Sequence, residues 1–245
     1  MKSLLYLFIS IFLLNMCAFA GPPFRTNDPG LLPYLGGEIY LFSSGTFDHG
    51  GANGIGPAIE FNYELLRKGF VHLVLPLAFN APNHSKSNFG PGDIELGFKY
   101  QFWAQKDWFP AVATFPLTEI PAGKASEGLG NGKPQYFLPV WLEEDFGNWT
   151  VYGGGGYWVN LGPGNDNWEF SGILVQYNFS DSFFLGTELF HQTKSSIDSK
   201  SYTGIHLGGG ISVVKNYQIL FSTDIGNGIT SYKHFSYYLG LYHTF

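Results

Sequence analysis

The stretch that decides the fold is Ile94-Glu95-Leu96-Gly97-Phe98-Lys99-Tyr100-Gln101-Phe102, in which large apolar residues alternate with small or polar ones. Successive side chains of a β-strand point to opposite sides. One face of this strand therefore carries Ile94, Leu96, Phe98, Tyr100 and Phe102, and the other carries Glu95, Gly97, Lys99 and Gln101. The segment is predicted to be a strand between an apolar and an aqueous environment.

The same alternation recurs along the chain in segments of about ten residues. That is the length of a tilted membrane strand, whereas a membrane-spanning helix needs roughly 20 apolar residues. After residue 20 the longest clean apolar run is 73–79, and it contains Pro76. We predict twelve strands, at residues 36–47, 56–65, 68–79, 92–103, 108–119, 134–144, 147–160, 167–178, 181–192, 202–214, 216–226 and 233–245.

The connections between these strands alternate in length. Every second connection is short, as at 65–68, 104–107, 144–147, 178–181 and 214–216, and the others are mostly longer, as at 48–55, 80–91, 120–133 and 192–201. This alternation is typical of an up-and-down membrane barrel with short periplasmic turns and long outer loops. The alternation of apolar and polar residues alone would also fit a soluble β-sandwich. A sandwich, however, gives no reason for the connections to alternate in length.

The last predicted strand supports the barrel. Phe235, Tyr237, Leu239, Leu241 and Phe245 share one face, with His243 as an interruption. A terminal aromatic residue that ends such a strand resembles the assembly signal of bacterial outer-membrane barrels. We expect Phe245 to engage the outer-membrane assembly machinery and the barrel wall to contact outer-membrane lipid.

The placement of aromatic residues and the low charge content also fit a membrane barrel. Charged residues make up 13% of the chain, about half the roughly 25% of a soluble domain. Aromatic residues are expected at both membrane interfaces. They occur near the short turns (Trp103, Trp108, Trp149, Tyr177, Phe179) and near the long loops (Phe79, Phe89, Trp168).

The N-terminus has the three parts of a secretory signal. Lys2 is followed by an apolar run at 4–14 and by Ala18-Phe19-Ala20, so cleavage after Ala20 is predicted. A lipoprotein signal at Cys17 is the alternative, but the residues before Cys17 are not small. The predicted domains are a signal peptide at 1–20, an N-terminal periplasmic lead segment at 21–35 and a transmembrane β-barrel at 36–245, located in a Gram-negative-type outer membrane.

The composition excludes several classes of function. A net charge of −6 argues against binding nucleic acid, which requires Lys and Arg to neutralise phosphates. The single cysteine, Cys17, lies in the signal, so the mature chain has no disulfide and no Cys-ligated metal. The seven histidines are scattered without a metal motif. No cofactor and no metal are predicted.

Several motifs carry a family resemblance. They are Gly21-Pro22-Pro23-Phe24-Arg25-Thr26-Asn27-Asp28-Pro29, Gly92-Asp93-Ile94-Glu95-Leu96-Gly97-Phe98-Lys99-Tyr100, Phe115-Pro116-Leu117-Thr118-Glu119-Ile120-Pro121-Ala122-Gly123, and the stretch 128–160. Together they resemble a family of bacterial outer-membrane transporters related to the barrel proteins of the meta-pathway of phenol degradation. The resemblance implies an outer-membrane barrel and small-molecule passage, and it implies no established functional residues.

The inward faces of the predicted strands supply the candidate site. The residues expected to line the lumen or a substrate path are Glu38, Glu60, Glu64, His72, Glu95, Lys99, Tyr152, Trp158, Glu188, His206, Asp224 and His234. Charges inside a narrow barrel must be paired, so they form either an ion-pair network that plugs the interior or a polar pore. In a pore, the excess of carboxylates favours cations. Aromatic residues beside them suit a small, aromatic or cationic solute.

Three functions follow in order of preference. The first is a monomeric outer-membrane channel or transporter for small molecules. The second is a non-transporting structural or interaction barrel whose loops act outside the cell. The third is an outer-membrane hydrolase, because His234 and Ser236 have the spacing of a His-x-Ser pair. Their predicted lumen face does not suit a lipid substrate and no third catalytic residue can be assigned, so an enzyme is not expected.

The predicted topology can be tested by labelling. With an even number of strands, both termini lie in the periplasm and the long connections face outward. Cysteines introduced at Ser85 and Ser126 should react with a membrane-impermeant reagent on intact cells, and a cysteine at Gln105 should not. The opposite labelling pattern would refute the topology.

Overall fold

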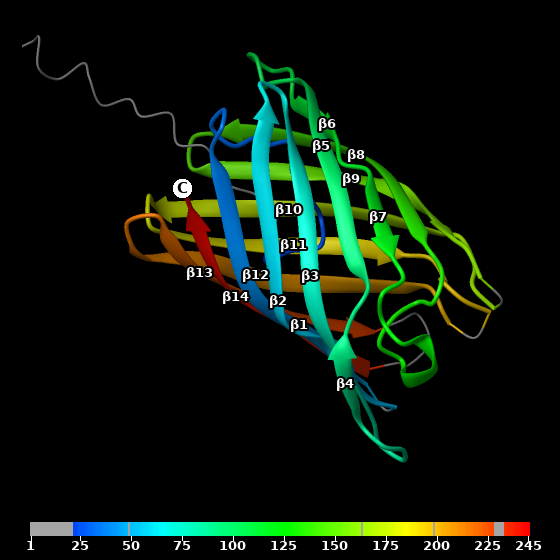
Figure 1. Ribbon diagram of the computed structural model, residues 1–245. Coiled ribbons are helices and arrows are strands. Elements are labelled where there is room, and N and C mark those ends of the chain that lie inside the picture. Colours follow the sequence, from blue (N-terminus) through cyan, green and yellow to red (C-terminus); the bar gives the residue numbers. More distant parts are fainter. Residues whose placement is uncertain (1–21, 49, 163, 198, 228–232) are drawn as a thin grey trace, which may run out of the picture.

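The computed structural model describes residues 22–48, 50–162, 164–197, 199–227 and 233–245, which form a closed antiparallel β-barrel (Figure 1). The predicted all-β, single-barrel fold is confirmed. The predicted signal peptide at 1–20 lies outside the described residues. No helix in the described ranges is long and apolar enough to cross a membrane.

Twelve strands make up the wall, although the sheet contains fourteen segments. β4 continues into β5, and β6 and β7 together form one strand that is interrupted at Phe115 and Pro116. Pro116 has no N–H to give to a ladder. The segments are β1 Gly37–Asp48, β2 Gly51–Leu66, β3 Gly69–Pro82, β4 Asn88–Pro91, β5 Ile94–Trp103, β6 Ala111–Thr114, β7 Leu117–Ile120, β8 Gln135–Phe146, β9 Trp149–Asn160, β10 Trp168–Ser180, β11 Phe183–Gln192, β12 Tyr202–Val214, β13 Tyr217–Asn227 and β14 Lys233–Thr244, with a short 3₁₀ helix η1 at Ala125–Glu127.

The first and last strands close the barrel. β1 pairs with β14 along its length, with Leu41 opposite Leu241 and Phe47 opposite Phe235. The main chains of Gly37 and Phe245 exchange two hydrogen bonds of 2.9 Å. Closure pairs the wall strands on both sides, as the hydrocarbon core of a membrane requires, whereas the short segment β4 pairs only with β3.

The two ends of the barrel differ as the sequence predicts, but two of the long loops are shorter than expected. Short turns and the C-terminus lie at one end, and the longer connections lie at the other (Figure 1). The prediction of a long loop at 48–55 is wrong, because β1 reaches Asp48 and β2 starts at Gly51. Most of the predicted loop 80–91 is strand as well. The glycine-rich start of β2 has a weak strand propensity, yet it lies between two paired neighbours, and this tertiary pairing overrides the propensity.

The predicted separation into an outer apolar face and an inner face is confirmed. In β3, Leu75 is 49% exposed and its neighbour Val74 only 7%. In β11, Leu189 is 49% exposed, whereas Glu188 is completely buried. The exposed apolar residues of the other strands include Ile59, Leu96, Leu138, Ile173, Ile205, Leu207 and Leu239. The wall therefore presents apolar side chains to its surroundings and collects its charges inside.

Most predicted interface aromatics lie on the outer surface, with one exception. Trp103, Trp108, Trp149 and Phe179 near the short turns and Phe89 near the long connections are exposed. Trp168 is different, because it stacks on Trp158 inside the barrel, with ring centroids 5.2 Å apart. Trp168 lies at the long-connection end of β10 as predicted, but it faces the interior and not the membrane interface. Its place opposite Trp158 in the β9–β10 ladder turns it inward.

The two faces of β3 should respond differently to a charge. Leu75→Arg places a cation in lipid, which is expected to cost about 2–4 kcal/mol of folding free energy if the residue lies near the membrane midplane. Val74→Arg points into the lumen and should cost less. Leu65→Arg, on the same outer face but close to a short turn, is a control for depth. Chemical denaturation in lipid vesicles measures all three, and equal losses for Leu75→Arg and Val74→Arg would contradict the assignment of faces.

Candidate functional site

The segment 22–36, which we call the lead segment, runs inside the barrel before it joins β1. Ser222 donates a hydrogen bond of 2.6 Å to the Pro23 carbonyl, and Gln101 donates one of 3.0 Å to the Pro29 carbonyl. Phe24 packs against Tyr152 and Leu174 from the wall. Contacts with β5, β9, β10 and β13 mean that the lead segment crosses the lumen. Which side of a membrane it belongs to stays a prediction.

Glu188 is the main anchor of the lead segment. Its carboxylate is completely buried and accepts hydrogen bonds from the Arg25 main chain at 3.1 Å and from the Thr26 main chain and hydroxyl at 2.5 and 2.6 Å. His206 Nδ1 lies 2.6 Å from the other side of the same carboxylate. Gly172 makes this possible, because a Cβ there would collide with the Thr26 side chain.

A second anchor joins the lead segment to β5. Lys99 Nζ lies 3.7 Å from Asp28 Oδ2, and both side chains are buried. The ammonium also lies over the rings of Phe70 and Phe115, at 5.0 and 5.2 Å from their centroids. Burial raises the pKa of the Asp28 carboxyl to about 6, although Lys99 acts in the opposite direction. Lys99 and Glu95 share one face of β5, but it is Asp28, from outside the strand, that pairs with Lys99.

A polar network lines the lumen on the side formed by β1, β2, β3 and β5. The Asn62 amide donates to Glu38 and to Glu60, each at 2.8 Å. His72 contacts Asn62 through Nδ1 at 2.6 Å and Glu95 through Nε2 at 2.8 Å. A hydrogen-bonded chain therefore connects Glu38 to Glu95, which is the pairing that buried carboxylates require.

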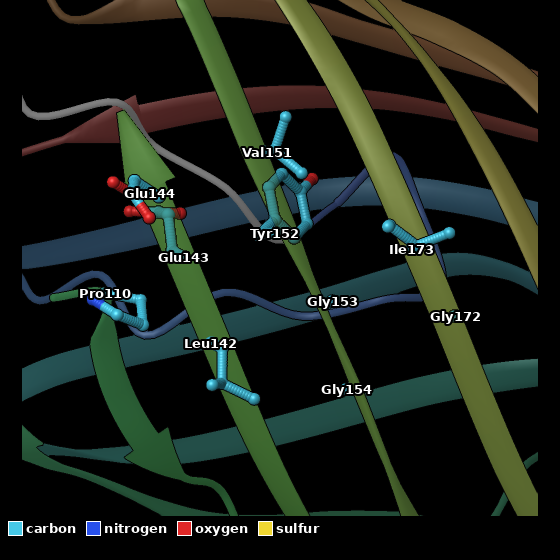
Figure 2. A pocket seen from close by; sticks show the side chains of 10 residues that line it. All are labelled: Pro110, Leu142, Glu143, Glu144, Val151, Tyr152, Gly153, Gly154, Gly172 and Ile173. Carbon is cyan, nitrogen blue, oxygen red and sulfur yellow. The ribbon is translucent and has the colours of Figure 1, made fainter. Parts of the chain in front are cut away.

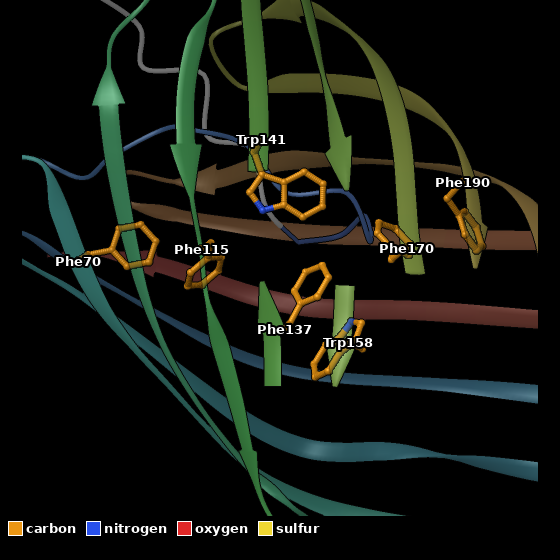
Figure 3. Close-up of a cluster of buried hydrophobic side chains, with 7 residues drawn as sticks. All are labelled: Phe70, Phe115, Phe137, Trp141, Trp158, Phe170 and Phe190. Carbon is orange, nitrogen blue, oxygen red and sulfur yellow. The ribbon is translucent and has the colours of Figure 1, made fainter. Parts of the chain in front are cut away.

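Aromatic side chains fill another part of the interior. Figure 3 shows Phe70, Phe115, Phe137, Trp141, Trp158, Phe170 and Phe190, all buried, projecting from neighbouring strands. Phe137 stacks on Trp158 with centroids 4.7 Å apart. The cluster narrows the bore.

The glycine run of β9 makes room for these large neighbours. A Cβ at Gly154 would collide with Trp141 and the β8 backbone, and one at Gly156 would collide with Phe137. Around the same run, a hollow of about 330 Å³ lies among Leu142, Val151 and Ile173, with Glu143 and Tyr152 beside it (Figure 2). These glycines accommodate the bulky side chains of the neighbouring strand.

Two adjacent cavities open between the long connections, and we call them together the vestibule. One, of about 660 Å³, is lined by Glu60, Asp93, Glu95 and Glu119 and by the β7–β8 connection. The other, of about 1060 Å³, is lined by Arg25 of the lead segment, by His206 and Asp224, and by the β11–β12 connection. Asn53, Gly54, Ile55 and Glu119 line both. The lead segment lies at the base of this polar space.

The predicted candidates fall into two groups around the lumen. Glu38, Glu60, Glu64, His72, Glu95 and Lys99 belong to β1–β5, whereas Tyr152, Trp158, Glu188, His206 and Asp224 belong to β9–β13. All of them are buried except Glu95, whose side chain is 26% exposed to the vestibule. The side chain of His234 lies outside the described residues. The lead segment brings the two groups together through Asp28 and Thr26.

Among the histidine side chains that the structure describes, His206 lies near Ser236, with Nε2 3.5 Å from Oγ. Asp224 Oδ2 lies at the same distance from this nitrogen and accepts a 2.7 Å hydrogen bond from Tyr202. The Ser236 main-chain N–H donates to Asp224 Oδ1 at 2.8 Å. These contacts form a structural network around Glu188.

Sequence reasoning missed Thr26, Asp28, Asn62 and Glu119. Thr26 and Asp28 belong to the motif 21–29 that carries the family resemblance. This motif was the one signal in the sequence that the segment has a role in the structure. Their partners are more than 60 residues away in the sequence, so no local pattern could find the contacts. Asn62 and Glu119 do lie on predicted strands, and their inward positions could have been read from the alternation.

Comparisons with known proteins establish the fold and not the family. No model of a known family matches the sequence, and no curated protein matches it. The relationship to the meta-pathway barrels therefore stays a prediction. Among solved structures, an outer membrane channel from Pseudomonas putida F1 is 14% identical and superposes with a TM-score of 0.70, covering 93% of this chain and 100% of the other.

Two further structures share the fold less closely. The KdgM porin, solved in complex with disordered oligogalacturonate, is 9% identical with a TM-score of 0.57, covering 85% of this chain and 99% of the other. The translocator domain of the autotransporter NalP from Neisseria meningitidis is 11% identical with a TM-score of 0.55, covering 87% and 89%. The chain has the fold of outer-membrane barrels, and this fold serves more than one function.

The role of Glu188 as an anchor can be tested by hydrogen exchange. Glu188→Gln keeps the shape of the side chain but weakens charge-assisted hydrogen bonds, each worth about 1.5–3 kcal/mol. Exchange of the Arg25 and Thr26 amides should therefore accelerate about tenfold or more, while the β-ladder amides stay protected. Glu169→Gln, on the outer face of β10, is the control. Unchanged exchange at Thr26 would rule out the anchor, and faster exchange throughout the barrel would indicate a general loss of stability.

Proposed function

We propose that the chain is an outer-membrane channel that passes small polar solutes through the vestibule and past the lead segment. The observation that carries the proposal is the vestibule itself, whose larger cavity of about 1060 Å³ is lined by both charged wall residues and Arg25. A barrel that served only as a scaffold would have no need for a charged, water-accessible space above a separate segment of chain.

The lead segment is the barrier in this proposal. Thr26 and Glu188 are completely buried and Asp28 is 1% exposed, which leaves no room for a solute beside these contacts. Passage therefore requires the lead segment to move. Its anchors are polar and ionic contacts, which water can replace once the lumen opens, and Phe24 contributes an apolar contact that a solute would have to displace.

A non-transporting barrel is the second candidate, and the same burial favours it. If the contacts of Thr26 and Asp28 never open, the lead segment is a permanent plug and the barrel acts as a scaffold for its outer connections. The two candidates differ in whether the lead segment moves, so an experiment that fixes it in place distinguishes them.

A disulfide can fix the lead segment. A Cβ built at Gly172 would lie 3.3 Å from the Thr26 Cβ, close to the roughly 3.5–4.5 Å of disulfides, and the predicted mature chain has no other cysteine. Thr26→Cys/Gly172→Cys should lose most of its single-channel current in planar bilayers under oxidising conditions and recover it on reduction.

The single variants are the controls, and they should conduct in both conditions. Current that is absent from the unmodified chain over many insertions would support the non-transporting barrel. Equal current from the oxidised and reduced double variant would show that solutes do not pass the lead segment.

A further inference from the structure

We propose that the vestibule binds small zwitterions, with the solute's ammonium group between Glu95 and Glu119 and its carboxylate on Arg25. This inference rests on the proposed function, because it names the class of solute that enters the channel. It follows from two groups of opposite charge that line adjacent cavities sharing Glu119.

The acidic wall consists of two carboxylates in direct cross-strand positions. Glu95 of β5 is paired with Glu119 of β7 in the ladder, so the two carboxyl groups lie side by side on the same face of the sheet. Glu95 Oε1 contacts His72, and Glu119 Oε2 accepts a 2.6 Å hydrogen bond from Gln135. Within the described residues, the second oxygen of each carboxylate has no hydrogen-bond partner. An ammonium group between them would bind both oxygens and favour the ionised form of both carboxyl groups.

The basic wall is the guanidinium of Arg25. It lies over the rings of Phe170 and Phe190, at 5.3 and 4.6 Å from their centroids, and donates a 2.7 Å hydrogen bond to Gln192. Side chains in the described part of the chain offer it no ion pair within 4 Å. Because a guanidinium has five donor N–H groups, the aromatic faces hold it in place while further donors stay available for a carboxylate.

The carboxylates nearest to Arg25 are engaged elsewhere. Glu188 is bound by His206 and by the main chain and hydroxyl of the lead segment. Asp224 accepts hydrogen bonds from Tyr202 and from the Ser236 main chain. They compensate the charge of Arg25 at longer range, but they do not occupy its donors. A solute carboxylate can therefore bind Arg25 directly.

Glu119 links the two groups, because it lines both cavities. Glu119 and Arg25 line the larger cavity, and Glu119 and Glu95 line the smaller one, in the size range of small-molecule sites. A simple cation pairs with the carboxylates but is repelled by Arg25. A simple anion pairs with Arg25 but is repelled by the carboxylates. A zwitterion pairs with both walls, so charge complementarity selects this class.

The test compares three probes of similar size: 4-aminobutanoate, butanoate and butylammonium. Saturation-transfer NMR on the full mature chain in detergent detects weak binding without transport. We expect 4-aminobutanoate to bind about three- to tenfold more tightly than either singly charged probe, the range that one added ion pair of about 1 kcal/mol gives.

Matched variants test which charged side chain binds which charged group of the solute. Arg25→Gln should remove the preference over butylammonium, and Arg25→Lys should keep part of it. Glu95→Gln/Glu119→Gln should remove the preference over butanoate. Glu127→Gln and Lys194→Gln change exposed charges that form ion pairs on the connections, and they should leave all three affinities unchanged. Electrophoretic mobility of the unheated protein checks that each variant is folded.

The outcomes distinguish a failure of the zwitterion site from a failure of the proposed channel. Selective binding of 4-aminobutanoate without any current supports the zwitterion site and refutes the proposed passage. Current with equal binding of all three probes refutes the zwitterion site and leaves the channel intact. Butylammonium that binds as tightly as 4-aminobutanoate would mean a plain cation site and would overturn the role of Arg25.

Discussion

The hydrocarbon core of a membrane offers no hydrogen-bond partner, and the rest of this structure depends on that constraint. A sheet in such a medium must close on itself, and here β1 closes on β14 through Gly37 and Phe245. Closure separates the side chains into a lipid-facing set and an enclosed set. The chain can then keep apolar residues such as Leu75 outside and bury Glu188 and Lys99 inside, where each must find partners within the lumen.

The lead segment supplies part of those partners. Asp28 lies beside Lys99, and the main-chain N–H groups of Arg25 and Thr26 satisfy Glu188. Without the lead segment these buried charges would need water or a solute instead. The same contacts therefore stabilise the closed lumen and could be exchanged when it opens. A barrel whose interior is held by ionic contacts is better suited to such an exchange than one filled with apolar side chains only.

The fold could be predicted from the sequence because its determinants are local. The alternation in 94–102 and the lengths of the connections are visible without any knowledge of contacts, and they predict the wall and its faces. The candidate site could be predicted only in part. Glu60, His72 and Glu188 follow from the inward face of their strands. Their partners, Asn62 and Thr26, depend on register and on a segment that returns into the lumen. The inward face of Trp168 could have been read from the alternation as well, because it shares one face of β10 with the buried Phe170 and Leu174.

The central claim is that the lead segment closes a path that the barrel itself provides. The most direct measurement is single-channel conductance of a mature chain that begins at Leu31 and so lacks the anchors at Arg25, Thr26 and Asp28. The account predicts that this chain folds into the same barrel and conducts more than the full mature chain, in discrete steps. A folded barrel that carries no more current without the anchors would contradict it.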